Sequence, residues 1–497
     1  MSKTLIGLMA TVFVFVAALA TSAVSQSAEV PAAVTMPDTY AGQMAQQFLD
    51  AFNSGEEQQW REYFLQDPKA RDSAEVLQRR MDMTQFLHGD LGGLDARKLV
   101  EDNEYMIKFL TKARDPKGPF NWVVLAMDFD SLPPHGIKSI GIQPGDEPGK
   151  ELPQGELRPE QMAALLDEYV QGMADEDRFS GTVLVAKDGE PIYKKAFGQA
   201  NLRYHVPNQI DTKFNLGSMN KMFTGVAIAQ LAEQGKLSFD DPVGKFLKDY
   251  PNKEVAEKVT IHHLLTHTSG LSDYWEPLFN GNFTTVRTVQ GYAELFWNDS
   301  LLFEPGERFQ YSNAGPIVLG LIIEKISGQS YFDYCIDHIH KPAGMINSDC
   351  YEMDAVVENL AFGYTRTDME GRPVDGPRRN NMFLHAVMGG PAGGGWSTVE
   401  DLLGFARALQ SGQLVGKAYV DTLTTGKEEM GPDMKYGYLF GEEFRDGHRI
   451  VGHNGGAPGI SAQLDMYVDL GYTVAVLSNY DMMAGIVAAK IGEMIVR

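Results

Sequence analysis

Apolar residues recur at helical spacing after Pro159, where we expect a helix to begin. They share one face at 3.6 residues per turn: Met162, Leu165, Leu166, Tyr169, Val170 and Met173. A hairpin is predicted next, with strands at residues 182–186 and 192–197 around a polar turn that contains Asp188-Gly189. The chain closes with alternating strands at 462–468 and 472–478 and a helix from about Met483. The two ends of this region therefore predict one shared antiparallel sheet, with a mostly helical middle.

Residues 38–148 predict a separate, smaller α+β domain. Met44, Phe48 and Phe52 recur at helical spacing, and residues 53–55 (Asn-Ser-Gly) then end that helix. A second helix is indicated by Trp60 and Phe64, and strand-like runs follow at 105–110, 120–129 and 137–142. Helices followed by a curled antiparallel sheet resemble the cystatin-like folds, which often serve as accessory domains.

A proline-, glycine- and charge-rich segment at 149–158 is predicted to be the linker to the main domain at 159–497. The length of 497 residues agrees with more than one domain. We therefore predict an α+β protein with a small accessory domain and a larger C-terminal domain.

The first 28 residues have the order of a secretory signal. Lys3 precedes an apolar run from Leu5 to Ala20, and small and polar residues follow up to Ala28. The alternative is an uncleaved membrane anchor, but a run of 16 residues is short for a span of about 20. We expect an exported protein, periplasmic or secreted, without stable membrane insertion after cleavage.

The charge balance excludes one class of partner. The formal net charge is -23, which repels phosphate backbones and argues against nucleic acid. The oligomeric state is not determined by these data. Two cysteines, Cys335 and Cys350, leave a disulfide and two buried thiols equally open, because sequence gives no separation between them.

Candidate chemistry begins with Ser218 and Lys221, in the segment Asn-Leu-Gly-Ser-Met-Asn-Lys before a predicted helix. Residues three apart share one helix face. A serine hydroxyl needs an adjacent base, and a desolvated lysine can be that base. A single Ser-x-x-Lys is weak evidence, because a solvent-exposed lysine near a helix cap has the same spacing.

Two further elements carry matching chemistry. Tyr311-Ser312-Asn313 offers a phenol that can relay a proton and an amide that can orient a substrate carbonyl or the lysine. Residues 452–459 read Gly-His-Asn-Gly-Gly-Ala-Pro-Gly, which brings His453 and close-approaching glycines to a strand. A backbone N–H there can stabilise an oxyanion. The structural alternatives are a packed tyrosine and a glycine-rich turn.

In this order and spacing the three elements resemble the penicillin-recognising serine hydrolases, a group of class C β-lactamases, D-alanyl-D-alanine carboxypeptidases, D-aminopeptidases and esterases. Supporting segments are 260–271 (Thr-Ile-His-His-Leu-Leu-Thr-His-Thr-Ser-Gly-Leu), 320–328, 342–345 and 394–402. The resemblance covers residues 160 to 497. It implies a β-lactamase-like fold, an antiparallel sheet flanked by helices with a mostly helical subdomain.

The resemblance also implies roles. Ser218 is acylated, Lys221 accepts its proton, Tyr311 shuttles protons, and the N–H groups of Ser218 and Gly456 form the oxyanion hole. Asn313, His453, Gly455 and Gly456 contact the substrate or the oxyanion. The third motif departs from the Lys-Thr-Gly of β-lactamases and carboxypeptidases, because it reads His453-Asn454-Gly455. A neutral histidine holds an anionic substrate less well, which favours small esters or short amides and peptides over β-lactams.

No cofactor is expected, and no metal either. His262, His263 and His267 have no acidic partners at ligand spacing, and Ser397 with Glu400 indicates a capping box rather than part of a site. The alternative functions are a β-lactamase or D-alanyl-D-alanine carboxypeptidase, and a non-catalytic binding or sensing protein that uses the same pocket.

Overall fold

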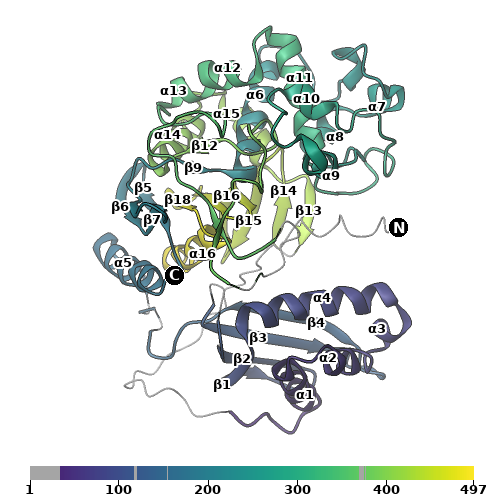
Figure 1. The fold of residues 1–497 in the computed structure, drawn as a ribbon, viewed down its shortest axis with the longest axis vertical. Coiled ribbons are helices and arrows are strands. Elements are labelled where there is room, and N and C mark those ends of the chain that lie inside the picture. Colours follow the sequence, from purple (N-terminus) through teal and green to yellow (C-terminus); the bar gives the residue numbers. More distant parts are fainter. Residues whose placement is uncertain are drawn as a thin grey trace. The chain divides into compact units, whose positions relative to one another are not determined.

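The computed structural model describes residues 34–116, 120–150, 152–153, 155–368, 374, 376–431 and 433–497. The described residues up to 155 form one compact unit, and residues from 156 onward form a second. Figure 1 shows the helices and strands of both units. Each unit has its own buried hydrophobic core. The predicted signal at 1–28 lies outside the described residues. Within those ranges, no helix is both long and apolar enough to cross a membrane.

The first unit packs helices against one antiparallel sheet of order β1-β2-β3-β4. Its elements are α1 (Tyr40–Ser54), α2 (Glu57–Phe64), α3 (Pro68–Asp72), α4 (Ala74–Leu91), β1 (Leu94–Asp102), β2 (Met106–Ala113), β3 (Trp122–Phe129) and β4 (Ile137–Pro144). Helix α1 ends as predicted, because Gly55 adopts a left-handed φ of 70°. The sequence did not predict α4 or β1. The cystatin-like resemblance stays a prediction.

The second unit is larger, and its early elements include Asn215–Lys221, which we call the nucleophile segment because it contains the predicted nucleophile Ser218. Up to residue 343 they are α5 (Pro159–Asp175), β5 (Gly181–Lys187), β6 (Glu190–Phe197), β7 (Gln199–Asn201), β8 (Val206–Pro207), β9 (Phe214–Asn215), η2 (Gly217–Asn220), α6 (Lys221–Glu233), η3 (Val243–Lys245), α7 (Lys253–Lys258), α8 (Ile261–Leu265), α9 (Trp275–Pro277), η4 (Leu278–Asn282), α10 (Val289–Ala293), α11 (Ala314–Ser327), α12 (Tyr331–Cys335), η5 (Ile336–His340) and α13 (Lys341–Ala343).

The remaining elements complete the sheet. They are β10 (Tyr364–Thr365), β11 (Arg379–Asn380), β12 (Trp396–Ser397), α14 (Val399–Gln410), α15 (Lys417–Thr424), β13 (Glu428–Gly431), β14 (Met434–Tyr436), β15 (Gly441–Arg445), β16 (His448–Ala457), β17 (Ile460–Tyr467), β18 (Tyr472–Ser478) and α16 (Met483–Ile495).

An eight-stranded antiparallel sheet of order β13-β14-β15-β16-β17-β18-β5-β6 organises this unit. As predicted, its first and last segments meet, because β18 pairs with β5 from Tyr472↔Lys187 to Ser478↔Gly181. The predicted hairpin β5–β6 turns through Asp188 and Gly189, whose φ angles of 50° and 82° fit a two-residue turn.

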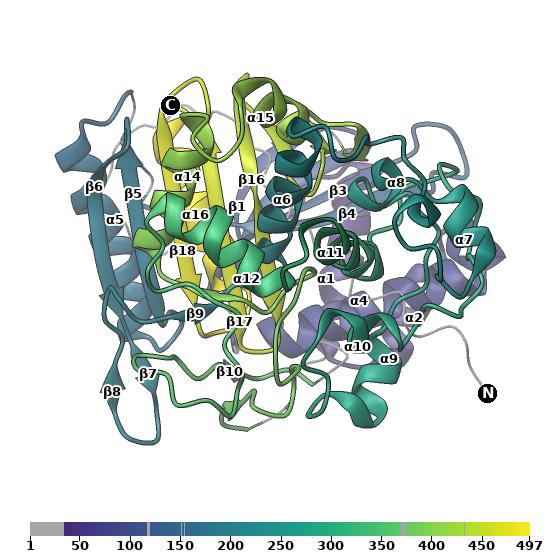
Figure 2. The ribbon, with the colours of Figure 1, turned by 90° about the horizontal axis from the view of Figure 1, so that it is seen from above.

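Helices cover both faces of this sheet. Helix α5 packs on β6, α16 packs on β17 and β18, and these two helices also contact each other. Helix α14 contacts β18 and β5 and lies on the other face with the helical region (Figures 1 and 2). Figure 2 shows α6 and α11 next to one another, and they place the first two motifs.

The structure also decides two local questions that the sequence raised: the cap of helix α14 and the state of the two cysteines. Helix α14 is capped one residue later than predicted: Thr398 Oγ1 accepts from Asp401 N at 3.2 Å, while Ser397 Oγ is engaged by Ser348 Oγ at 2.7 Å. Cys335 and Cys350 are free, buried thiols, so the disulfide alternative is not formed.

Candidate active site

The nucleophile segment turns sharply before helix α6. Ser218 lies in the 3₁₀ turn η2, and Lys221 is the first residue of α6. Gly217 has a left-handed φ of 50°, and a Cβ on it would lie 2.9 Å from Gly456 N. A glycine is therefore required where this turn meets strand β16.

The side chain of Lys221 is completely buried and points at three oxygen atoms. Its Nζ lies 3.0 Å from Ser218 Oγ, 2.8 Å from Asn313 Oδ1 and 2.6 Å from the Ala392 carbonyl oxygen. A neutral amine has two N–H groups and one lone pair. The amide oxygen and the carbonyl oxygen accept those two N–H groups, so the lone pair faces the serine hydroxyl.

Burial also adjusts the acidity of this amine. Desolvation lowers the pKa of Lys221 from 10.5 to about 7, while the nearby Asp273 carboxylate raises it. A substantial fraction of Lys221 is therefore neutral at neutral pH. A base poised near the working pH is the most effective kind of general base.

The second motif lies immediately before and at the start of α11. The Tyr311 ring is 4.8 Å from Lys221 Nζ, and the Ser218 side chain lies near its phenol. Burial raises the pKa of Tyr311 above its ordinary value of 10, so the phenol stays protonated and can donate. Asn313 uses Nδ2 to donate to Asp273 Oδ2 at 3.3 Å, which turns its Oδ1 toward Lys221.

The third motif lies on β16, where this strand loses one neighbour. Pairing with β15 ends at Gly441↔Gly452, whereas pairing with β17 continues to Ala457↔Ile460. The edge left by β15 meets the nucleophile turn: a Cβ on Gly455 would lie 1.8 Å from Leu216 O and 3.0 Å from Ser218 N. The structure thus brings Gly455 and Gly456 next to Ser218.

His453 is buried, and both of its ring nitrogens have partners. Its Nε2 is 2.9 Å from Tyr436 Oη, and its Nδ1 is 2.5 Å from Asn454 O. Burial and the Lys221 charge lower the pKa of His453 from 6.5 to about 3. At neutral pH this histidine is uncharged, as the sequence predicted.

Sequence reasoning missed several residues of the site. Asp273, Ala392, Tyr436 and His267 contact the motif residues but belong to no spacing pattern, and they are joined to them only by the fold. The order Ser-Asp-Tyr after the 260–271 segment was the only available signal for Asp273.

The three histidines of segment 260–271 serve different partners. His262 Nδ1 contacts Tyr438 Oη at 2.8 Å, His263 Nδ1 accepts from Thr260 N at 3.2 Å, and His267 Nδ1 accepts from Ser312 N at 3.3 Å. Among the described residues, no group of three or more His, Cys, Asp or Glu side chains is arranged to hold a metal.

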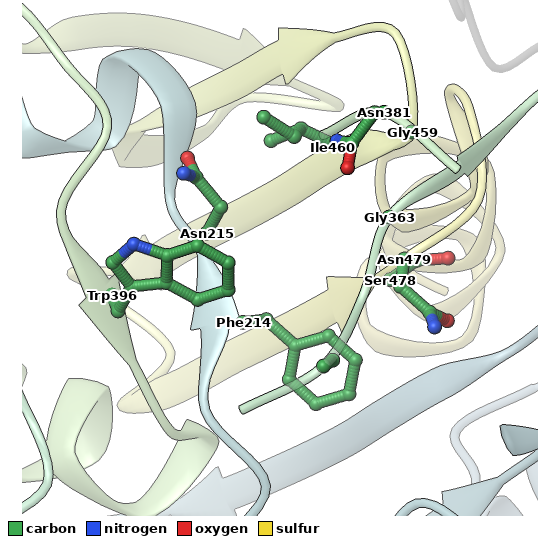
Figure 3. A pocket seen from close by; sticks show the side chains of 10 residues that line it. Phe214, Asn215, Gly363, Asn381, Trp396, Gly459, Ile460, Ser478 and Asn479 are labelled. Carbon is green, nitrogen blue, oxygen red and sulfur yellow. The ribbon is translucent and has the colours of Figure 1, made fainter. Parts of the chain in front are cut away.

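A small pocket lies behind the nucleophile segment (Figure 3). It is lined by Phe214, Asn215, Ala361, Gly363, Asn381, Trp396, Gly459, Ile460, Ser478 and Asn479. Its size suits about one water molecule, far less than a substrate site. Asn479, which lines this pocket, has a buried Oδ1 without a protein partner, as would suit a bound water.

Comparison with known proteins assigns this arrangement to a family. The beta-lactamase family model matches residues 165–489. The chain belongs to the beta-lactamase family. Penicillin-binding protein 4* of Bacillus subtilis is 33% identical over 325 residues, which cover 63% of this chain and 71% of the relative. Esterase EstB of Burkholderia gladioli is 29% identical over 318 residues, 56% of this chain and 79% of the relative.

A comparison with solved structures supports the same fold for the second unit. The crystal structure of a penicillin-binding protein from Bacillus halodurans has a TM-score of 0.60 and 33% identity, and the match covers 66% of this chain and 99% of that one. The second unit therefore has the β-lactamase-like fold, and the chain is a serine hydrolase of this family. The family model begins to match at residue 165, after the main segment of the first unit has ended at Gly155, so it does not describe that unit.

Proposed function

We propose that this beta-lactamase family protein cleaves small esters or short amides and peptides through an acyl-enzyme on Ser218. The observation that carries the proposal is the set of contacts at Lys221 Nζ, where two fixed acceptors leave the lone pair for the serine proton. The sequence left two roles open for Asn313, orienting a substrate carbonyl or orienting the lysine. We propose the second role, because Asn313 Oδ1 accepts from Lys221 Nζ.

In the proposed reaction, Lys221 takes the proton of Ser218 and the serine oxygen attacks the substrate carbonyl. The N–H groups of Ser218 and Gly456 stabilise the oxyanion. Tyr311, held protonated by burial, gives a proton to the leaving alcohol or amine, and the proton that Lys221 took from Ser218 then restores the phenol. Water then repeats the sequence on the acyl-enzyme and regenerates the serine.

Hydrolysis of p-nitrophenyl butyrate by the full chain and by Ser218→Ala tests this proposal. Loss of the nucleophile should lower kcat by about a thousandfold or more. Ser411→Ala is the matched control, because Ser411 ends α14 and its hydroxyl bonds only the Ala408 carbonyl. Equal activity of the Ser218 variant and the parent would show that another residue is the nucleophile.

The charges around the site favour carboxylate-free substrates. His453 is neutral where β-lactamases and carboxypeptidases use a lysine, and Asp273 adds a carboxylate near Lys221. We therefore expect a higher kcat/KM for p-nitrophenyl butyrate than for penicillin G. The reverse order would favour the β-lactamase or carboxypeptidase alternative, and a protein that neither turns over these substrates nor reacts with a fluorophosphonate would be a binding protein.

A second candidate is hydrolysis of amides or esters that carry a free amine. Burial raises the pKa of Asp273, whereas hydrogen bonds from the N–H groups of Asn313 and Tyr274 and the Lys221 charge favour its charged form. A carboxylate so placed can pair with a substrate ammonium. Asp273→Asn should then reduce kcat/KM for phenylalanine p-nitroanilide more than for its deaminated analogue, whereas an equal reduction would remove this candidate.

We further propose that the protein is exported, on the strength of the charged start and apolar run in residues 1–28. Expression of the full chain followed by mass spectrometry of the mature N-terminus tests this. Cleavage in the small-residue region after Ala20 is expected. An intact N-terminus on membrane-bound protein would indicate an anchor instead.

A further inference from the structure

A chain of three buried side chains connects the second and third motifs. His267 Nδ1 accepts from Ser312 N at 3.3 Å, and His267 Nε2 lies 3.1 Å from Tyr436 Oη. The same phenol lies 2.9 Å from His453 Nε2, and His453 Nδ1 lies 2.5 Å from Asn454 O. We call His267, Tyr436 and His453 the tether.

The two ends of the tether determine where every proton lies. Ser312 N–H can only donate, so His267 Nδ1 is unprotonated and its Nε2 carries the hydrogen. That hydrogen is donated to Tyr436 Oη, and the phenol hydrogen is therefore donated to His453 Nε2. His453 then carries its hydrogen on Nδ1 and donates it to the Asn454 carbonyl oxygen.

These hydrogen-bond directions require both histidines to be neutral. A charged His267 would direct an N–H at the Ser312 N–H, and a charged His453 would direct one at the phenol hydrogen. Burial and the neighbouring Lys221 charge lower the pKa of both rings, His453 to about 3. Two titratable groups outside the tether act on it: the Lys221 charge lowers the pKa of both histidines, and Tyr311 adds to the rise that burial causes in the pKa of Tyr436.

Both ends of the tether are backbone atoms, so no proton can pass along it to substrate or solvent. What it can do is fix distances. Ser312 follows the catalytic Tyr311, and Asn454 precedes the glycines that meet Ser218. In addition, the His267 ring lies 4.4 Å from the Tyr311 ring, and the Tyr436 ring lies edge-on to it at 6.4 Å.

We propose that the tether is a positioning device that holds the oxyanion edge of β16 in register with the Tyr311 segment, and that Tyr436 is its central positioning residue. The proposal rests on the proposed function of Ser218, Lys221 and Tyr311. It also assigns His453 a different part from a substrate ligand, because both of its ring nitrogens are already engaged.

Tyr436→Phe tests the tether, with Tyr438→Phe as its matched control. Tyr438 is two residues further along and also places its phenol on a histidine, His262, at 2.8 Å, but it contacts none of the three motifs. We expect Tyr436→Phe to lower kcat about ten- to a hundredfold with KM within about threefold, as misplacement of reacting groups does. Tyr438→Phe should keep kcat within about threefold.

Two outcomes would overturn the proposal. Unchanged kcat per folded molecule in Tyr436→Phe would make the tether a purely stabilising contact. A raised KM with unchanged kcat would make Tyr436 or His453 a substrate ligand. The pH profile adds a readout: the variant should gain a second ionisation on its acid side, because His453 loses the donor that keeps Nε2 unprotonated.

If Tyr436→Phe does not fold, substitutions at His453 make the same distinction. The amide oxygen of His453→Gln can accept from Tyr436, whereas His453→Leu offers no acceptor. We expect the Gln variant to retain at least about ten times the kcat of the Leu variant, and equal values would contradict the tether.

One measurement is independent of the proposed reaction. Nitrogen chemical shifts of the two imidazoles in the parent should show the stated neutral tautomers, without titration between pH 8 and 5. Titration of either ring in that range would overturn the tether even in an active enzyme. If instead the parent is inactive on all substrates but its rings behave as stated, the proposed reaction fails and the tether stands.

Discussion

At the scale of single residues, the proposed reaction depends on the ionisation of Lys221. Its folded pKa lies near 7, and only the neutral amine can accept the serine proton. For a neutral ester, kcat/KM should therefore rise with pH up to about 7 and level off above it. Measuring kcat/KM for p-nitrophenyl butyrate from pH 5 to 9 checks this.

A substitution at Asp273 tests whether the pH dependence of kcat/KM comes from Lys221. Its charge raises the pKa of Lys221, so Asp273→Asn should move the rise in kcat/KM to lower pH. A profile that does not move, or that moves to higher pH, would mean that the carboxylate is uncharged in the free enzyme.

The close approach between strand β16 and the segment before Ser218 requires a residue without a side chain at Gly455. In Gly455→Ala the new Cβ would lie 1.8 Å from Leu216 O, so the nucleophile turn and the strand must separate. We expect kcat to fall by about a hundredfold, as a shift of about 1 Å between reacting groups can cause. Gly172→Ala is the control, since it is exposed on α5 with no atom within 4 Å of its new Cβ. Similar activities in both variants would contradict the close approach.

The sequence identified residues whose partners lie at a short or familiar spacing, and it failed where only the fold supplies the partner. Ser218 and Lys221 are three apart, and the structure places their side chains 3.0 Å apart. Asp273 is 40 residues from Asn313, and Tyr436 is 169 residues from His267. No periodicity relates such pairs, so neither residue was predicted.

At the scale of elements, strong patterns were predictable and mixed ones were not. Helix α5 and the hairpin β5–β6 have clean apolar stripes or turn residues, and both formed as expected. Helix α4 buries Thr84 and exposes Met83, and the edge strand β1 is largely exposed. Their polar and apolar residues therefore do not separate into faces, so neither element has a clear periodic pattern that would predict it.

The cap of α14 provides an element-scale prediction. Thr398 Oγ1 accepts from Asp401 N and satisfies one of the free N–H groups of the first turn. Thr398→Ala should destabilise the protein by about 1 kcal/mol, measured as a loss in the free energy of unfolding of the second unit. Thr398→Ser retains the hydroxyl and should stay closer to the parent. An Ala variant as stable as the Ser variant would show that the cap contributes nothing.

At the scale of the whole molecule, the two units have separate buried cores, and all motif residues belong to the second. A shortened protein that begins at residue 156 should therefore fold and keep kcat/KM for p-nitrophenyl butyrate within about threefold of the full chain. In calorimetry, the shortened protein should show one unfolding transition fewer than the full chain. A soluble, folded second unit without activity would assign the first unit a part in the reaction.

The pairing of β18 with β5 has a consequence for how the protein is made. Gly181 is synthesised well before its partner Ser478, which lies 297 residues further along the chain (478 − 181). Until then β5 has β6 on one side and an unfilled hydrogen-bonding edge on the other. Such edges attract other chains. The nascent chain therefore carries this open strand edge until β18 has been synthesised, and the central sheet can close only afterwards.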